Sequence, residues 1–308
     1  MIVFYKNNNG LEVSEKWSSN SWISFENPTA EEKDYILNTL QVPEAFYNDI
    51  EDIDERPRIE IENGWTLIVI RIPLISDEDK LPFSTMPLGI IFKDDVILTL
   101  SFKESDVLQD FIVYQNKKKL EIKNHYDLVL KLLVSSSIWY LKYLKQLSQM
   151  INKAEDNLEQ SVRNEELHKL IQIEKCLVFF MTSLKGNDVL LHRVKNIKTE
   201  RDNFDPELLE DAVIELRQAQ EMTGIYSNIL AGMMDAYASV IANNMNEIMK
   251  QLTSISIILM IPTVIASFYG MNVINYLEDN PYGMAILVGI SVLLSVVGVL
   301  LFRRRRFF

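Results

Sequence analysis

A stripe of small, polar and methionine side chains runs through an apolar segment near the C-terminus. Its members follow one another at steps of three or four residues: Asn246, Met249, Thr253, Ser256, Met260, Thr263, Ser267 and Gly270. Side chains with this spacing share one face of an α-helix. Two interpretations remain open, namely close packing between membrane helices and the lining of a water-filled pore on an oligomer axis. Asn246 at one end of the stripe and Asn272 beyond the other favour the pore.

Two uncharged segments lie in this part of the chain, one over residues 251–277 and one over residues 284–302. Each is long enough to cross about 30 Å of hydrocarbon at about 1.5 Å per helical residue. The loop between them has no Lys or Arg, whereas Arg303 to Arg306 directly follow the second segment. The positive-inside rule therefore places both termini in the cytoplasm. We predict a cell-membrane protein with a transmembrane helix at 251–272, an extracytoplasmic loop at 273–283, a transmembrane helix at 284–302 and a basic cytosolic tail at 303–308.

The larger N-terminal part is predicted to be cytosolic, and its sequence pattern divides it into three regions of different predicted secondary structure. Residues 1–120 contain short β-rich runs and a helix opened by a capping box, in which Glu32 follows Thr29 by three positions. Residues 121–204 keep apolar residues at helical spacing and are expected to form a helical hairpin. Asp205 and Pro206 are a helix start signal, and apolar positions then continue into the membrane segment. We expect one helix of about 64 residues, with 205–250 as the cytosolic part of a stalk.

Composition excludes several classes of function. The formal net charge of -12 argues against nucleic-acid binding, which normally needs a basic surface. We find no Gly-rich phosphate loop, and the three histidines lack metal-ligand or triad spacing. The single Cys176 lies in an apolar helical run and is expected to be a buried, inert thiol. The sequence therefore predicts neither an enzyme active site nor an organic cofactor.

The tripeptide Gly270-Met271-Asn272 in "FYGMNV" resembles the Gly-Met-Asn signature of the CorA family of magnesium and cobalt transport proteins. The whole run "MNEIMKQLTSISIILMIPTVIASFYGMNV" is similar to the first membrane helix of that family. The order of segments is similar too, with an acidic α/β domain, a helical stalk, two terminal spans and a short basic tail. The resemblance covers essentially the full chain and is strongest over residues 205–306.

This resemblance implies a funnel-shaped homopentamer in which the first span lines the pore. Asn272 and the Gly270 backbone then form an outer selectivity ring, and Met271 belongs to the same filter. The path inward is implied to be lined by Thr263, Met260, Leu252, Met249 and Asn246, with Met249 and Leu252 as candidates for a hydrophobic gate. Leu252 lies beside the stripe rather than on it, so the facing of Leu252 and Thr253 stays open.

Asparagine suits the transport of Mg²⁺, which holds its water shell tightly and prefers octahedral oxygen ligands. Neutral amide and carbonyl oxygens can bind the hydrated ion and still release it, whereas carboxylates in the same place would bind too strongly for conduction. Glu278 and Asp279 in the loop are candidates for acids that concentrate cations at the outer mouth. Their alternative role is that of ordinary exposed loop acids.

The resemblance also implies regulatory metal sites between subunits on the cytosolic side. Asp49 in "YNDIEDIDERPRIE" matches the acidic position of the family, although Asn48 stands where an acid often precedes it. The stalk partner corresponds to Asp211, and Asp235 is a candidate for a second site. Crowded carboxylates at an interface cost free energy that a divalent cation relieves. The alternative is that these are ordinary surface acids.

These features together predict channel-like uptake of Mg²⁺, with Co²⁺ and Ni²⁺ as further permeants, gated by cytosolic Mg²⁺. The first alternative is a zinc-transporting member of the same superfamily. The second is a membrane-anchored oligomeric sensor or scaffold that does not conduct. The expected partners are the membrane, divalent cations and further copies of the chain, and the fold class is an α/β domain followed by long helices and two transmembrane helices.

Overall fold

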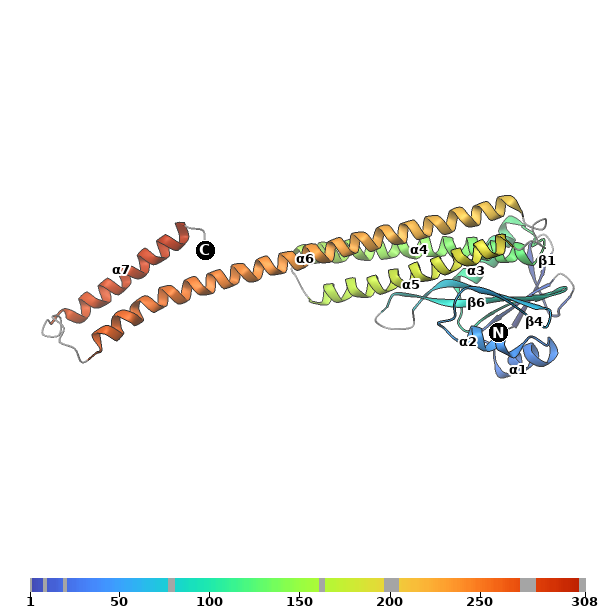
Figure 1. Ribbon diagram of the computed structural model, residues 1–308, viewed down its shortest axis with the longest axis horizontal. Helices are drawn as coiled ribbons and strands as arrows, with labels where there is room; N and C mark the ends of the chain where they lie inside the picture. The colour runs from blue at the N-terminus through green and yellow to red at the C-terminus, as the bar shows by residue number, and fades with distance from the viewer. Residues whose placement is uncertain are drawn as a thin grey trace. The chain divides into compact units, whose positions relative to one another are not determined.

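The computed structural model of the chain describes residues 2–7, 10–18, 21–76, 81–160, 164–196, 205–271 and 281–304 (Figure 1). The chain divides into two compact units, Met1–Gly232 and Met233–Phe308. The first contains a β-sheet with helices on both faces, and the second contains the apolar C-terminal helices.

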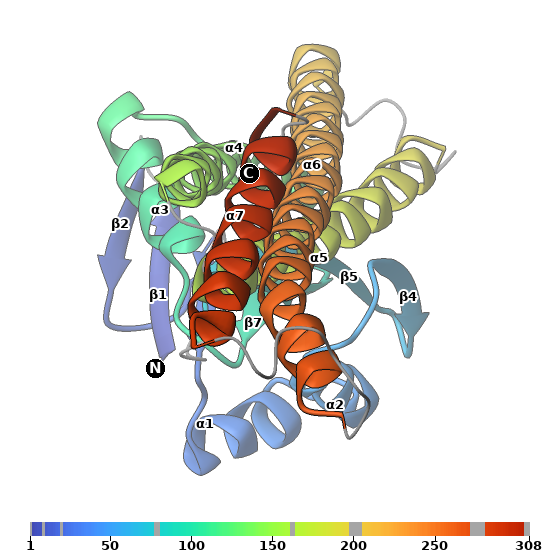
Figure 2. The same ribbon diagram turned by 90° about the vertical axis from the view of Figure 1, so that its left-hand side faces the viewer.

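The first unit is built on a seven-stranded sheet with the order β2-β1-β3-β7-β6-β5-β4. Strands β3 and β7 pair in parallel and the other neighbouring strands pair antiparallel. Figure 2 shows β2 and β4 at opposite ends of the sheet. The central strands are buried on both faces because helices cover both. The strands are β1 Ile2–Asn7, β2 Leu11–Ser14, β3 Ser21–Glu26, β4 Arg58–Glu62, β5 Trp65–Ile75, β6 Phe83–Lys93 and β7 Val96–Ser101.

One face of the sheet is covered by α1 (Ala30–Asp34), the π-helical turn η1 (Tyr35–Thr39) and α2 (Glu44–Glu51). Phe46 and Ile50 of α2 are buried in a core cluster that includes sheet residues such as Leu67. The capping box predicted from the sequence is confirmed, since Thr29 and Glu32 bond reciprocally at the start of α1. This packing fixes α2 beside β6 and β7, which places the polar face of α2 near the turn that leads into β4.

The other face of the sheet is covered by α4 (His125–Gln160) and α5 (Asn164–Lys195), which pack against β5 and β6, while α3 (Asp106–Lys118) packs against α4. Figure 1 shows α4 and α5 on the side of the sheet opposite α1 and α2. Tyr140 of α4 and Phe180 of α5 are fully buried and meet edge to face at 5.0 Å between ring centroids. This contact joins α4 to α5, and Phe83 of β6 stacks on Tyr143 of α4 at 4.4 Å, which joins the helical pair to the sheet.

Helix α6 (Pro206–Tyr269) has 64 residues. The Asp205 carboxylate accepts the backbone N–H of Glu207 at 3.2 Å, and Pro206 occupies the first helical position. Both the predicted start and the predicted length of this helix are thus confirmed. In the second unit, Figures 1 and 2 show α7 (Gly283–Arg304) beside the C-terminal part of α6. Within the described residues, α6 and α7 are the helices long and apolar enough to cross a membrane.

Candidate functional site

The polar stripe of α6 lies on a face that α7 does not cover. A Cβ atom added at Gly298 of α7 would lie 3.5 Å from Ile261 and 3.8 Å from Ile258, so these isoleucines face α7. Met260 and Thr263 each follow one of them by two positions, which is about 200° around an α-helix. The stripe therefore lies on the side of α6 nearly opposite the side that faces α7. In the single chain, Met260 is 62% exposed.

The hydroxyl groups of the stripe donate their protons to the helix backbone. Thr253 donates to the Met249 carbonyl at 2.8 Å, Ser256 to the Leu252 carbonyl at 2.8 Å, and Thr263 to the Leu259 carbonyl at 3.0 Å. Their oxygen lone pairs remain as acceptors. The water shell of a hydrated cation points its O–H donors outward, so a face of acceptors can receive it without stripping the shell. The chemistry of this face therefore fits a hydrated cation.

The remaining stripe residues extend this face at both ends. Asn246, Met249 and Leu252 are exposed on α6 towards its N-terminal side, and Ser267 is exposed near its C-terminal end. Helix α6 ends at Tyr269, where the Gly270 N–H still bonds the Ala266 carbonyl at 2.9 Å. Met271 is 52% exposed. Asn272, Glu278 and Asp279 lie outside the described residues, so the selectivity ring and the outer-mouth acids stay predictions.

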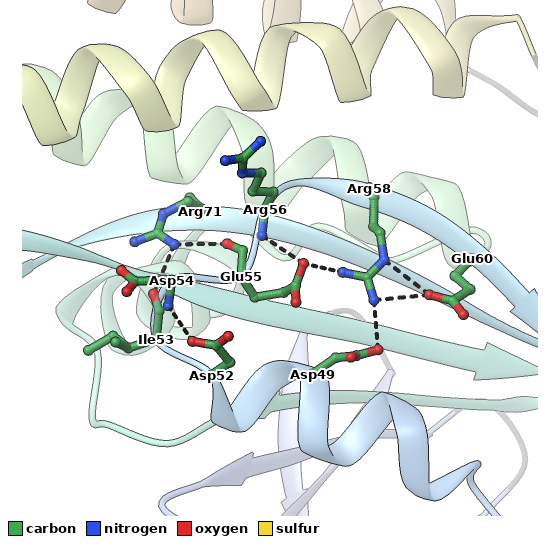
Figure 3. Close-up of polar contacts among 9 residues, drawn as sticks. All are labelled: Asp49, Asp52, Ile53, Asp54, Glu55, Arg56, Arg58, Glu60 and Arg71. Carbon is green, nitrogen blue, oxygen red and sulfur yellow. Dashed lines mark hydrogen bonds and ion pairs between the residues drawn. The ribbon is translucent and has the colours of Figure 1, made fainter.

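A cluster of carboxylates surrounds Arg58 in the first unit (Figure 3). Asp49 comes from α2, Glu55 from the turn after α2, and Glu60 from β4. The Arg58 Nη2 atom lies 2.6 Å from Asp49 Oδ2 and 3.0 Å from Glu60 Oε2, and Nη1 binds Glu55 Oε1. We call these four residues the Arg58 cluster. Its side chains are partly exposed, with 26% of Arg58 and 29% of Asp49 accessible.

Opposing effects act on the charges of the Arg58 cluster. Partial burial raises the pKa of Asp49, and the repulsion of Glu55 and Glu60 adds to this, whereas Arg58 opposes it. For Arg58, burial disfavours the charged form, but its hydrogen bond with Glu60 and the nearby carboxylates outweigh burial and raise the pKa. The arginine is therefore held charged while its acids crowd one another.

A second arginine fixes the turn that carries Glu55. Arg71 of β5 donates to the carbonyl oxygens of Ile53 at 2.9 Å and Glu55 at 2.8 Å. Its own backbone N–H and C=O are bonded by the side chain of Asn187 on α5, at 2.9 and 2.8 Å. Burial lowers the pKa of Arg71. Arg71 thus ties the acidic turn to the sheet and to α5, and the cluster sits on a fixed support.

The three acids predicted to hold regulatory metal are placed separately. Asp49 is in the Arg58 cluster, whereas Asp211 is exposed in the first turns of α6 and Asp235 is exposed on α6 in the second unit. Among the described residues of the single chain, no group of three or more His, Cys, Asp or Glu side chains is arranged to hold a metal ion. Sequence reasoning missed Arg58 and Arg71, although the two arginines inside the acid-rich run "DIEDIDERPRIE" were a signal for a counter-ion.

Comparison with known proteins places the chain among ion transporters. A family model described as CorA-like Mg²⁺ transporter protein matches residues 17–304. The cobalt/magnesium transport protein CorA of Methanocaldococcus jannaschii is 28% identical over 294 residues, covering 92% of this chain and 90% of that protein. The protein of the same name from Thermotoga maritima is 22% identical over 265 residues, covering 84% of this chain and 74% of that protein.

The solved structures agree in fold. The complete structure of the CorA magnesium transporter from Methanocaldococcus jannaschii superposes with a TM-score of 0.82 at 25% identity, covering 99% of this chain and 98% of that one. The predicted fold class is therefore confirmed, with an α/β domain, a long helix and apolar C-terminal helices.

Proposed function

The chain belongs to the family of CorA-like Mg²⁺ transporter proteins, and from this we propose that it carries Mg²⁺ and Co²⁺ across the cell membrane along the polar stripe of α6. The observation that carries the proposal is the uncovered face of acceptor oxygens and methionines leading to Gly270. Such a face would be a poor lipid contact, because hydrocarbon offers no partner to a hydroxyl oxygen. It is a good contact for water and for a hydrated ion. Ni²⁺ is proposed as a further permeant on the resemblance alone.

The stripe needs other copies of the chain to enclose a pore. One α6 presents one face, so a closed pathway requires several such faces around an axis, as a symmetric homo-oligomer provides. We take five copies from the family resemblance. Asn272 and the Gly270 backbone would then form the outer ring, and Met249 and Leu252 a narrow apolar gate on the cytosolic side. Both termini are assigned to the cytoplasm on the arginines that come after the second span.

Regulation by cytosolic Mg²⁺ is the second part of the proposal. Asp49 of one subunit and Asp211 of a neighbour would share a cation that holds the channel closed, with Asp235 as a second site. The support is electrostatic: Asp49 already stands among Glu55 and Glu60, and a divalent cation would relieve their repulsion. The single chain holds no complete metal site in its described part, which fits a site that only an assembly completes.

Flux through liposomes tests the transport proposal. Purified protein is reconstituted with a Mg²⁺-sensitive dye inside, and wild type is compared with Asn272→Ala and with Asn275→Ala as a matched control in the same loop. We expect flux from wild type and the control and little from Asn272→Ala. Absence of flux from an intact wild-type oligomer would refute transport, and flux of Zn²⁺ without Mg²⁺ would refute the assigned substrate.

Protease protection tests the regulatory proposal separately. Mg²⁺ is expected to protect the cytosolic part of the wild-type protein, and the double variant Asp49→Asn/Asp211→Asn is expected to need much more Mg²⁺ for the same protection. Unchanged protection of this variant would remove the regulatory assignment and leave the transport proposal in place.

A further inference from the structure

Arg58 occupies the carboxylate that the proposed regulation gives to a divalent cation. Its Nη2 atom is 2.6 Å from Asp49 Oδ2, and the same guanidinium contacts Glu55 and Glu60 (Figure 3). Three acids from three different elements thus converge on one arginine. Their combined charge exceeds that of the guanidinium, so the cluster stays net negative and still attracts a cation.

The Glu55 carboxylate and the turn that carries it are held in place by contacts other than Arg58. The Glu55 Oε1 atom also accepts the Arg56 backbone N–H at 2.8 Å, and Asp52 accepts the Asp54 N–H at 3.0 Å. Arg71 fixes the carbonyl groups of Ile53 and Glu55. Removal of the Arg58 side chain would therefore leave Glu55 and its turn in place beside Asp49, because the backbone of this turn is anchored independently.

We propose that Arg58 is a tethered counter-ion that competes with the divalent cation for Asp49 and so sets the Mg²⁺ concentration at which the channel closes. This inference rests on the proposed regulatory role of Asp49. A cation approaching Asp49 has to displace the guanidinium from Oδ2 or share the carboxylate with it. In either case the positive charge of Arg58 weakens cation binding, and the threshold for closure is raised.

The size of the effect follows from Coulomb's law. For charges of +1 and +2 separated by about 6 Å in a water-like dielectric, the repulsion corresponds to on the order of tenfold in affinity. A water-like dielectric gives the lower limit of this effect, because only a quarter of the Arg58 side chain is exposed. A cluster without the arginine should therefore respond to about one tenth of the Mg²⁺ concentration.

The experiment measures the Mg²⁺ concentration that gives half-maximal protease protection of the full-length oligomer. Arg58→Gln is expected to lower this concentration by about tenfold, because it removes the Coulomb repulsion between the guanidinium and the cation. Arg56→Gln is the matched control, since Arg56 is exposed two positions away and its side chain points away from the cluster in Figure 3. Arg58→Lys keeps the charge. Both of these variants are expected to remain within about twofold of wild type.

A second variant is expected to raise the Mg²⁺ concentration that gives half-maximal protection. Glu60→Gln removes an acid that shares Arg58 and leaves the guanidinium more fully on Asp49, so it should raise the half-maximal Mg²⁺ concentration. This variant keeps the test decisive if Arg58→Gln does not assemble. Equal concentrations for wild type, Arg58→Gln and Glu60→Gln would overturn the competition. A higher requirement in Arg58→Gln would overturn it too, because Arg58 would then be building the site rather than blocking it.

Failure of the underlying proposal has a different signature. If Asp49→Asn keeps the wild-type half-maximal concentration, Asp49 is not a cation ligand, and the role of Arg58 falls with it. If Asp49→Asn loses protection while the Arg58 and Glu60 variants behave as wild type, the regulatory site stands and only the competition is refuted.

Discussion

Gly186 and Gly224 are both interior helical glycines, yet the same substitution should have opposite effects on stability at the two positions. An alanine Cβ at Gly186 of α5 would lie 2.8 Å from Pro57 Cγ and 2.9 Å from Pro57 Cδ. At Gly224 of α6 the nearest atom would be Met181 Cε, at 3.6 Å. Carbon atoms pack best at about 3.5–4.0 Å. Gly186→Ala therefore needs a shift of about 0.7 Å, whereas Gly224→Ala needs none.

The free energies follow from these distances. Alanine is favoured over glycine in a helix interior by about 1 kcal/mol. At Gly224 that gain remains, and we expect stabilisation by about 0.5–1 kcal/mol. At Gly186 the rigid proline ring cannot rotate away, and overpacking costs about 1–3 kcal/mol. Because the overpacking exceeds the gain, Gly186→Ala should destabilise the protein by about 1–2 kcal/mol.

Thermal unfolding of the purified full-length variants, followed by tryptophan fluorescence, measures the difference. A change of 1 kcal/mol moves Tm by about 2–4 °C in domains of 150–250 residues. Gly186→Ala should therefore unfold below wild type and Gly224→Ala above it. Shifts of the same sign would refute the reasoning, since the contact with Pro57 is the feature that distinguishes the two positions.

Three further predictions concern the support of the Arg58 cluster, a partly buried carboxyl group and a buried thiol. Arg71→Met leaves the Ile53 and Glu55 carbonyls without their donor and should lower the free energy of unfolding, measured by denaturant titration, by about 2–4 kcal/mol. The control Arg56→Met, at an exposed arginine of the same turn, should change the free energy of unfolding little. Desolvation raises the pKa of Glu26, so the contribution of this carboxyl group to stability is present at low pH and is lost as the pH rises. The Glu26→Gln variant should therefore have a higher Tm than wild type at pH 8 and lose that advantage at pH 4. A difference in Tm that stays constant with pH would contradict this. Burial raises the pKa of the Cys176 thiol, which donates to the Phe83 carbonyl at 3.1 Å, so iodoacetamide should label it only after unfolding, and rapid labelling of native protein would count against a buried thiol.

Local signals predicted the helices that carry the proposed pathway. Asp205 and Pro206 define a helix start because the cap and the fixed proline φ act within one turn. The uncharged run and the three-four spacing of Met249, Thr253 and Ser256 define a helix face for the same reason. These features depend on residues less than a turn or two apart, so they can be recognised without the tertiary fold.

The sheet order and the Arg58 cluster could not be predicted in this way. Strand β3 pairs with β7, more than seventy residues away in the register from Trp22 to Ile97, and no local pattern specifies that partner. Arg58 meets Asp49 only because the core packing of Phe46 and Ile50 turns the polar face of α2 towards the start of β4. Arg71 and Asn187 are likewise joined by the packing of α5 on β5.

A common physical constraint links the two proposed cation sites, because each has to bind a divalent ion without trapping it. The stripe of α6 meets this constraint with neutral oxygens, whose hydroxyl protons are already given to the helix. The acidic site uses carboxylates, since charged oxygen ligands bind a divalent cation tightly enough to be filled when the cation is plentiful. Arg58 makes such a site weak enough to empty by neutralising part of its charge in advance. A regulatory site without the Arg58 guanidinium would stay filled with Mg²⁺ at lower Mg²⁺ concentrations and would keep the channel closed when uptake is needed.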